Sequence, residues 1–134
     1  MIYALDSNII SYMLKKDKGV IQHFDNTVKD TDSYAIPPIV YYEVKRWLVH
    51  RNATAMLERF SSLYDDSVKG NMSAEVWEKS IDLYARLRSS GKTIDDADIF
   101  IAAYCILNGY VLATNNTQHF SLIPELKIVN WKSE

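Results

Sequence analysis

The sequence predicts an α/β protein with a single domain, in which a mostly parallel central sheet of about four to five strands is flanked by helices. Short apolar runs alternate with longer amphipathic segments along the whole chain. No two of the apolar runs are joined by a tight hairpin turn, so the strands must be connected through helices. At 134 residues, with 48% hydrophobic and 24% charged residues, the chain has the size and composition of one globular domain covering residues 1–134.

The individual elements follow from the spacing of apolar residues and from the turn residues between them. The predicted strands cover residues 2–5, 33–36, 110–114 and 127–129. The predicted helices cover residues 7–14, 20–28, 38–48, 54–64, 74–88 and 96–107, with a helical turn at 118–122. Ser7 or Asn8 can cap the first helix, and Gly19 separates it from the second. Because strands and helices alternate, helices are expected on both faces of the sheet.

Three carboxylates open the most apolar helix of the chain. Asp95, Asp96 and Asp98 precede residues 99–107, which are apolar on every face and therefore predict a helix buried on most sides. Asp95 as the N-cap, with an acid three residues later, is an imperfect capping box, so a purely structural role is one explanation. Three acids in four residues exceed what one cap requires, which favours a functional site.

Other acids are expected near the same place, because ligand sites form beyond the carboxyl ends of parallel strands. Asp6 follows the first predicted strand, and Glu43 lies near the start of the helix after the second. Taken alone, Glu43 is more typical of a solvent-facing residue. If the acidic helix starts at the same edge, Asp6, Glu43, Asp98 and Asp96 converge, and they repel one another unless a cation lies between them. Carboxylate oxygens select Mg²⁺ or Mn²⁺, which serve phosphoryl transfer.

Several other classes of protein are disfavoured by the composition. Cys105 is the only cysteine, so it forms no internal disulfide and is expected to be buried in its apolar helix. His23, His50 and His119 lack the spacing of a zinc site. The chain shows no signal peptide pattern or membrane-span length, so a cytoplasmic protein is expected. The net charge of −2 argues only weakly against an RNA partner, because acids bound to a metal leave the remaining surface about neutral or slightly basic.

These motifs resemble a known family, the PIN domain, and within it the VapC-type toxins of bacterial toxin–antitoxin pairs. Leu5-Asp6-Ser7-Asn8 looks like the family's opening motif D-[ST]-N, and Tyr42-Glu43-Val44 looks like its second acidic motif. The most specific likeness lies in the C-terminal third, in residues 94–103, 114–120 and 126–131. The resemblance covers nearly the whole chain and implies a single PIN-like domain.

The resemblance implies an endoribonuclease dependent on Mg²⁺ or Mn²⁺, which hydrolyses an RNA phosphodiester in line and leaves a 5′-phosphate and a 3′-hydroxyl. The implied catalytic residues, which are also metal ligands, are Asp6, Glu43 and Asp98. Many relatives have an acid where this chain has an asparagine at position 116, and Asp96 would supply the missing charge as a further ligand. The resemblance also implies that three residues lie behind the metal ligands and orient them by hydrogen bonds, namely Ser7, Thr114 and Asn116.

The resemblance also implies partners. Such toxins act on structured cellular RNA, often tRNA, are silenced by a cognate VapB-like antitoxin, and usually form homodimers. An apolar surface for the antitoxin is suggested by four aromatic residues, Tyr12, Tyr41, Tyr42 and Trp47. The candidate RNA contacts, each of which is also explained as a solvated surface charge, are Lys15, Lys16, Lys45, Arg46, Arg51, Arg86, Arg88 and Lys92.

Two other functions fit the same residues. A catalytically weak PIN-fold module would bind RNA or an antitoxin without turnover, and metal-dependent cleavage of RNA by the purified protein separates this alternative from a nuclease. A phosphotransferase or phosphatase would use Asp6 as its nucleophile. The D-x-D pattern expected for such an enzyme is Asp6-Ser7-Asn8 in this chain, and a trapped aspartyl-phosphate would be its signature.

Overall fold

The parallel sheet predicted from the sequence is present in the computed structural model, which describes residues 1–31 and 33–133. The strands within these residues are β1 (Tyr3–Leu5), β2 (Tyr34–Ala35), β3 (Val111–Ala113) and β4 (Ile128–Val129). They are hydrogen-bonded in the order β2-β1-β3-β4, and every pair is parallel. Leu5 lies opposite Ala113, and the N–H of Asp6 donates to the carbonyl of Ala113 at 3.0 Å. The two central strands therefore end at the same level.

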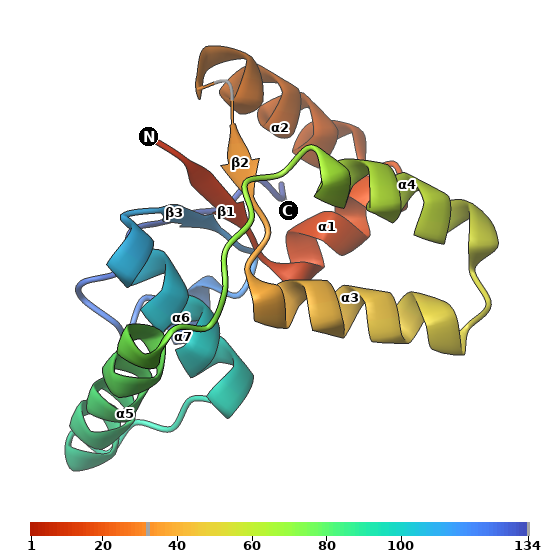
Figure 1. The fold of residues 1–134 in the computed structure, drawn as a ribbon. Helices are drawn as coiled ribbons and strands as arrows, with labels where there is room; N and C mark the ends of the chain where they lie inside the picture. Colours follow the sequence, from red (N-terminus) through yellow and green to blue (C-terminus); the bar gives the residue numbers. More distant parts are fainter. Residues whose placement is uncertain (32, 134) are drawn as a thin grey trace.

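Helices cover the sheet from both sides. The helices in the described residues are α1 (Ser7–Leu14), α2 (Lys18–Thr31), α3 (Pro38–His50), α4 (Thr54–Asp65), α5 (Ala74–Ser89), α6 (Asp96–Asn108) and α7 (Thr117–Phe120). In Figure 1, α5 and α6 pack together at the lower left, α1, α3 and α4 lie to the right, and the strands run between these groups. The inner faces of helices and strands share one core, whose largest fully buried side chains include Tyr104, Phe60, Phe120 and Leu5.

The first two helices begin differently from the prediction. Asp6, and not Ser7 or Asn8, caps α1, because its Oδ1 accepts the backbone N–H of Ser7 at 2.8 Å. The second helix begins at Lys18, so Gly19 lies within its first turn and does not separate the helices. Asp17 explains the earlier start, since its Oδ1 accepts the N–H of Val20 at 3.1 Å and satisfies a free donor of the first turn. A side-chain cap thus outweighs the low helix propensity of glycine.

The acidic segment opens a buried helix, as predicted. Residues 101–105 of α6 are all buried, and Gly109 ends the helix in the left-handed conformation at φ 71°. Cys105 is fully buried, which raises the pKa of its thiol and confirms it as a small apolar core residue. Asp95 occupies the N-cap position, but its side chain makes no capping hydrogen bond. Capping alone therefore does not account for the acids at this helix start.

Candidate active site

Three acids that are far apart in the sequence meet beyond the ends of β1 and β3. Asp6 follows β1 directly, Glu43 comes from the second turn of α3, and Asp98 from the first turn of α6. Only 4% of the surface of Asp6 is exposed, and this burial raises its pKa from 3.8 to about 6, with the charges of Asp98 and Glu43 acting in the same direction. Burial also raises the pKa of Asp98, and the charge of Glu43 adds to it. The structure thus brings Asp6, Glu43 and Asp98 together.

Both oxygens of Asp6 are held in place by hydrogen bonds. The hydroxyl of Thr114 donates to Oδ2 at 2.7 Å, and the amide of Asn8 donates to the same oxygen at 3.2 Å. Thr114 is fully buried, and its hydroxyl oxygen accepts the backbone N–H of Asn116 at 2.9 Å, which fixes the direction of its own proton. Thr114 therefore ties the end of β3 to the carboxylate at the end of β1.

Ser7 contacts two of the acids through different groups. Its backbone N–H bonds to Asp6, whereas its hydroxyl donates to Oε1 of Glu43 at 2.7 Å. The sequence predicted an orienting hydrogen bond from Ser7 to Asp6, and the backbone makes it. The contact between the Ser7 hydroxyl and Glu43, 36 residues along the chain, was not predicted.

Asn116 and His119 flank Asp98 on the side of α7. The amide of Asn116 donates to Oδ2 of Asp98 at 3.3 Å and lies 3.1 Å from Nδ1 of His119. Nδ1 of His119 lies 3.6 Å from the same carboxylate oxygen, and the proximity of the imidazole lowers the pKa of Asp98 against the effect of burial. His119 was not predicted at the site, because the histidines of the sequence lack zinc-ligand spacing. Its place one helical turn after Asn116 was the signal that connects it to the site.

Asp96 points to a different surface from the three acids. It is exposed and lines a depression with Trp77, Tyr84 and Phe100, between α5 and α6. Its neighbour Asp95, in contrast, is close enough to Asp98 for its charge to raise the pKa of that carboxyl. The structure does not bring Asp96 into the acid cluster, so its role as a further metal ligand stays a prediction.

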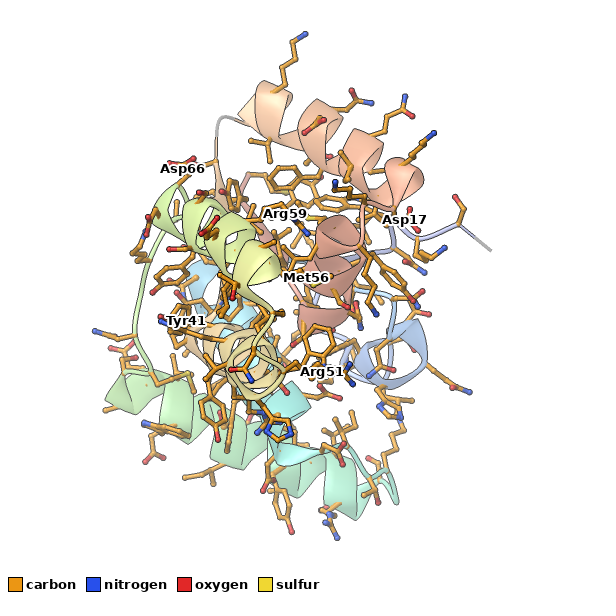
Figure 2. All side chains as sticks on the ribbon, turned by 90° about the vertical axis from the view of Figure 1, so that its right-hand side faces the viewer. Asp17, Tyr41, Arg51, Met56, Arg59 and Asp66 are labelled. Carbon is orange, nitrogen blue, oxygen red and sulfur yellow. The ribbon has the colours of Figure 1, made fainter. Side chains whose placement is uncertain are left out.

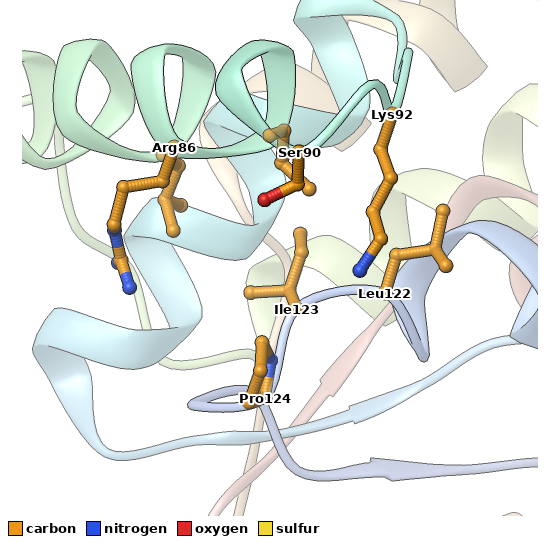
Figure 3. Close-up of a pocket in the computed structure, with 8 residues that line it drawn as sticks. Arg86, Ser90, Lys92, Leu122, Ile123 and Pro124 are labelled. Atoms are coloured by element: carbon orange, nitrogen blue, oxygen red, sulfur yellow. The ribbon is translucent and has the colours of Figure 1, made fainter.

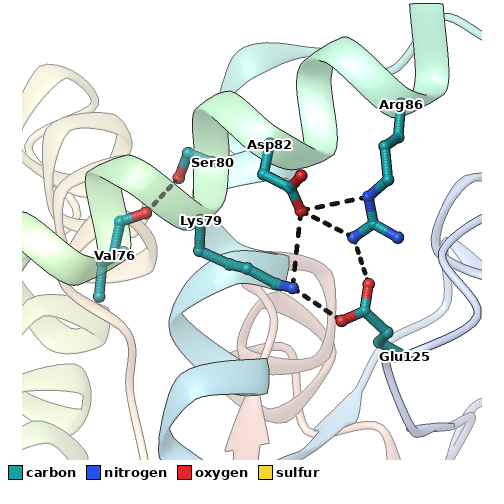
Figure 4. A network of polar contacts seen from close by, with 6 residues as sticks. All are labelled: Val76, Lys79, Ser80, Asp82, Arg86 and Glu125. Carbon is teal, nitrogen blue, oxygen red and sulfur yellow. Dashed lines mark hydrogen bonds and ion pairs between the residues drawn. The ribbon is translucent and has the colours of Figure 1, made fainter. Parts of the chain in front are cut away.

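Arg86, a predicted RNA contact on α5, is already paired with acidic side chains of the protein. Arg86 pairs with Glu125, and its Nη2 lies 3.0 Å from Oδ2 of Asp82. Lys79 completes this network at 2.7 Å from Glu125 (Figure 4). Arg86 also lines, with Lys92, a small pocket between α5 and residues 122–124 (Figure 3). The carboxylates beside Arg86 offset its charge, which makes it a weaker candidate for RNA binding.

The predicted contacts on α3 remain free of acidic partners. Lys45 donates to the hydroxyl of Tyr41 at 2.8 Å, and the guanidinium of Arg46 lies 4.9 Å from the ring centre of Tyr42. Both cations are exposed, and neither forms an ion pair within the described part of the chain. Arg88 on α5 similarly rests on the ring of Tyr84, at 4.9 Å. Lys45 and Arg46 therefore remain candidates for RNA contacts.

The donor set fits a hydrated divalent cation and not a closed protein cage. Among the described residues, no three His, Cys, Asp or Glu side chains are placed to hold a metal ion directly. Mg²⁺ usually keeps several waters and takes only one or two carboxylates, so a cage of three is not required. Burial raises the pKa of Asp6 and of Asp98, and the charges of the neighbouring acids add to this, so the ionised carboxylates are disfavoured without a cation. A hydrated Mg²⁺ or Mn²⁺ beside Asp6 and Asp98 would compensate their charge.

Comparison with known proteins agrees with the family and the fold predicted from the sequence. The sequence matches the PIN domain family over residues 3–126. It is 29% identical to ribonuclease VapC2 of Haemophilus influenzae, over 96% of this chain and 97% of that protein, and 28% identical to ribonuclease VapC2 of Rickettsia felis, over 98% of each. The fold matches VapBC2 from Rickettsia felis bound to a DNA fragment from their promoter, with a TM-score of 0.86 and 26% identity over 98% of this chain and 100% of that one.

A fold with a parallel sheet and a cluster of acids beyond its central strands defines a protein of the PIN-domain class. The chain belongs to the PIN domain family. The relatives that it matches along nearly its whole length are named VapC ribonucleases, which confirms the resemblance to VapC-type toxins predicted from its motifs.

Proposed function

We propose that this chain is a metal-dependent endoribonuclease toxin that a VapB-like antitoxin holds inactive. The observation that carries the proposal is the cluster of Asp6, Glu43 and Asp98, in which burial and mutual repulsion raise the pKa of Asp6 to about 6. Buried carboxylates that repel one another are typical of sites that bind a cation and a phosphate. The names of the ribonuclease relatives support the same activity.

The side chains at the site have separate roles in this proposal. When bound, Mg²⁺ or Mn²⁺ would stabilise negative charge on the scissile phosphate and favour ionisation of water. Asp6 and Asp98 would hold the cation, while Thr114 and Asn8 keep the Asp6 carboxylate from rotating. Glu43, held by the Ser7 hydroxyl at one oxygen, would accept the proton of the attacking water. The resulting hydroxide would form a bond to phosphorus as the bond to the 3′-oxygen breaks. The departing 3′-oxygen would take up a proton from solvent, leaving a 5′-phosphate and a 3′-hydroxyl, while Glu43 returns its proton to solvent.

The alternative is a PIN-fold module that binds RNA or an antitoxin without turnover. The open placement of the acids, with no three of the described side chains set to hold a metal directly, is the observation that favours it. Purified protein incubated with cellular RNA in Mg²⁺ or in EDTA separates the two functions. Fragments with 5′-phosphates that form only with metal support the nuclease. RNA that stays intact in both conditions supports the module.

The proposed partners are a structured cellular RNA, with tRNA as the first candidate, and a VapB-like antitoxin. VapBC toxin–antitoxin pairs are the subject of the structures that share this fold, which supports an antitoxin partner. The proposed location is the cytoplasm, where such RNA is found, and residues 1–134 would act as one domain. Within the described residues, no helix has both the length and the apolar run needed to cross a bilayer.

A homodimer through α5 is the proposed oligomeric state. Trp77, Ile81 and Tyr84 lie on one face of α5 at helical spacing, and each is exposed, Ile81 by 61%. Ile81→Lys is therefore expected to convert a dimer into a monomer in light scattering after gel filtration. The matched control is Val49→Lys on α3, which is 53% exposed and lies outside this face. A monomeric wild type at micromolar concentration would contradict the proposal.

Asn116→Asp is expected to lower the Mg²⁺ concentration for half-maximal cleavage by about 10-fold, because it adds a charge beside Asp98. Asp95→Asn and Asp96→Asn form a matched pair on the other side of Asp98. Only Asp95→Asn is expected to raise the Mg²⁺ requirement, since Asp95 acts on the pKa of Asp98. A rise for Asp96→Asn instead would establish the ligand role predicted from the sequence. The measurement is a cleavage rate titrated with Mg²⁺ for all four proteins.

A further inference from the structure

We infer that the groove between α1 and α3 holds one nucleobase of the RNA substrate, stacked on Trp47, next to the phosphodiester that is cleaved. The inference rests on the proposed nuclease function and adds to it a residue that positions the substrate.

The groove begins inside the acid cluster. Its volume is about 230 Å³, and its polar end is formed by Ser7, Asn8 and Glu43. Ser7 is bonded to both Glu43 and Asp6, and Asn8 is bonded to Asp6, so this end is the candidate active site itself. Trp47 lies one helical turn beyond Glu43, about 6 Å along α3. A group in the groove therefore lies immediately beside any phosphate bound at the acids.

The other end of the groove suits a flat ring. Its walls there are Leu14, Val44 and the indole of Trp47, which is half-buried. The groove is smaller than the clefts of about 300–1,000 Å³ that hold drug-sized ligands, so it has room for a single planar group. Nucleobases of any sequence stack on aromatic side chains, and unpaired bases of structured RNA bind proteins in this way.

Charges around the groove complement the phosphates on either side of such a base. The guanidinium carbon of Arg51 lies 4.9 Å from the centre of the Trp47 ring, and the ammonium of Lys15 lies 5.7 Å from it. Figure 2 looks onto α1, α3 and α4, with Arg51 labelled at the end of α3. Residues 7–18 and 38–51 carry six lysines and arginines against two carboxylates, although the whole chain has a net charge of −2. The positive charge is thus gathered along these two segments.

RNA fits the adjacent acidic, apolar and basic surfaces better than a segment of a protein partner does. Along about one helical turn, the occupant must place a cation at Asp6 and Asp98 beside Glu43. It must also place an apolar ring at Trp47 and negative charge at Lys15 and Arg51. A nucleotide with a divalent cation on its phosphate supplies all three from adjacent atoms. A peptide would need a basic, an aromatic and an acidic side chain in one tight succession.

The test uses the full chain and a short single-stranded RNA of mixed sequence, with binding measured in EDTA and cleavage in Mg²⁺. Trp47→Ala is expected to lower RNA affinity and kcat/KM by about 5- to 150-fold, the range for the loss of one base–aromatic stack. Trp47→Phe should keep most of the RNA affinity and most of kcat/KM. Leu107→Ala, which removes an exposed apolar side chain at the far end of α6, should change neither.

Tryptophan fluorescence separates stacking from a general loss of structure. RNA should quench the fluorescence of the wild type and of Trp77→Phe, but quenching should be much smaller in Trp47→Phe, which still binds. Arg51→Gln leaves the indole in place and is expected to reduce the steepness of log affinity against log salt by about 0.7, the value for one lost phosphate contact on a single strand. This variant keeps the test valid if Trp47→Ala fails to fold.

Two outcomes would overturn the inference. The first is unchanged RNA affinity and kcat/KM in both Trp47→Ala and Arg51→Gln. The second is a loss of binding to the VapB-like antitoxin in these variants while RNA binding stays intact, which would assign the groove to the antitoxin. A wild type that binds RNA with quenching in EDTA but does not cleave it would disprove the nuclease proposal alone. Cleavage that is the same in wild type, Trp47→Ala and Arg51→Gln, which is the first of these outcomes, would disprove the inference and leave the nuclease proposal standing.

Discussion

Asp98→Asn is expected to reduce metal-dependent RNA cleavage by more than about 100-fold, since even the hydrogen-bond partners of metal ligands typically contribute 10- to 100-fold. The protein should remain folded. Burial and the charge of Glu43 raise the pKa of Asp98, so its ionised form is unfavourable in the metal-free fold, and a neutral amide relieves this cost. The measurements are single-turnover cleavage rates and the melting temperature in EDTA.

A suitable control for Asp98→Asn is Glu75→Gln. Glu75 is also an acid in the first turn of a helix, but it is exposed on α5 and lies outside the cluster. Its substitution removes the same kind of helix-start charge and should leave cleavage unchanged. If Asp98→Asn keeps full activity, Asp98 is not a catalytic residue and the proposed site is wrong. If the melting temperature of this variant falls by many degrees, Asp98 has a structural role instead.

The metal-free protein is expected to become more stable as the pH falls from about 7 to about 5. The folded protein raises the pKa of Asp6 from 3.8 to about 6, so between these values it binds more protons than the unfolded chain. Ionisation of Asp6 costs no folding free energy below pH 3.8, and the cost grows as the pH rises from 3.8 to about 6. Above pH 6 it reaches about 3 kcal/mol, because each unit of pKa shift corresponds to 1.36 kcal/mol. About 1 kcal/mol of it is recovered between pH 7 and pH 5, a shift of a few degrees in melting temperature.

Two further measurements assign this pH dependence to Asp6. In Asp6→Asn, the gain in melting temperature on acidification should be much smaller, because the titrating group is gone. In the wild type, added Mg²⁺ should stabilise the protein more at pH 7 than at pH 5, since protons and the cation compete for the same carboxylate. An equal pH dependence in wild type and Asp6→Asn would show that other groups cause it.

The convergence of Asp6, Glu43 and Asp98 could be predicted because it depends on topology. Asp6 and Glu43 follow two strand ends, and the rule that parallel strands end at one edge needs no coordinates. Asp98 joined them only on the assumption that the acidic helix starts at the same edge. Topology could not predict which of Asp95 and Asp96 lies closer to the acid cluster. Adjacent residues at a helix start point about 100° apart, and the packing of α6 on α5 decides which of them faces the site.

The hydrogen bonds that support the acids were only partly predictable. The family resemblance implied that Thr114 orients Asp6, and the structure contains that hydrogen bond. The contact of the Ser7 hydroxyl with Glu43 depends on the approach of α3 to α1, and no local pattern records the distance between two helices. The position of His119 beside Asp98 likewise depends on the turn into α7. The core and the strand ends follow from periodicity, whereas side-chain pairs between elements follow from packing.

The capping bond of Asp6 decides which acid should be changed to prepare an inactive form for capturing bound RNA. Asp6 begins α1 and accepts hydrogen bonds from Ser7, Asn8 and Thr114, so replacing it disturbs the junction of β1, α1 and β3 along with the chemistry. Asp98 accepts its hydrogen bond from Asn116 at the edge of the cluster and caps nothing. A substrate trap is therefore best made at Asp98, where the groove and the strand ends keep their native shape.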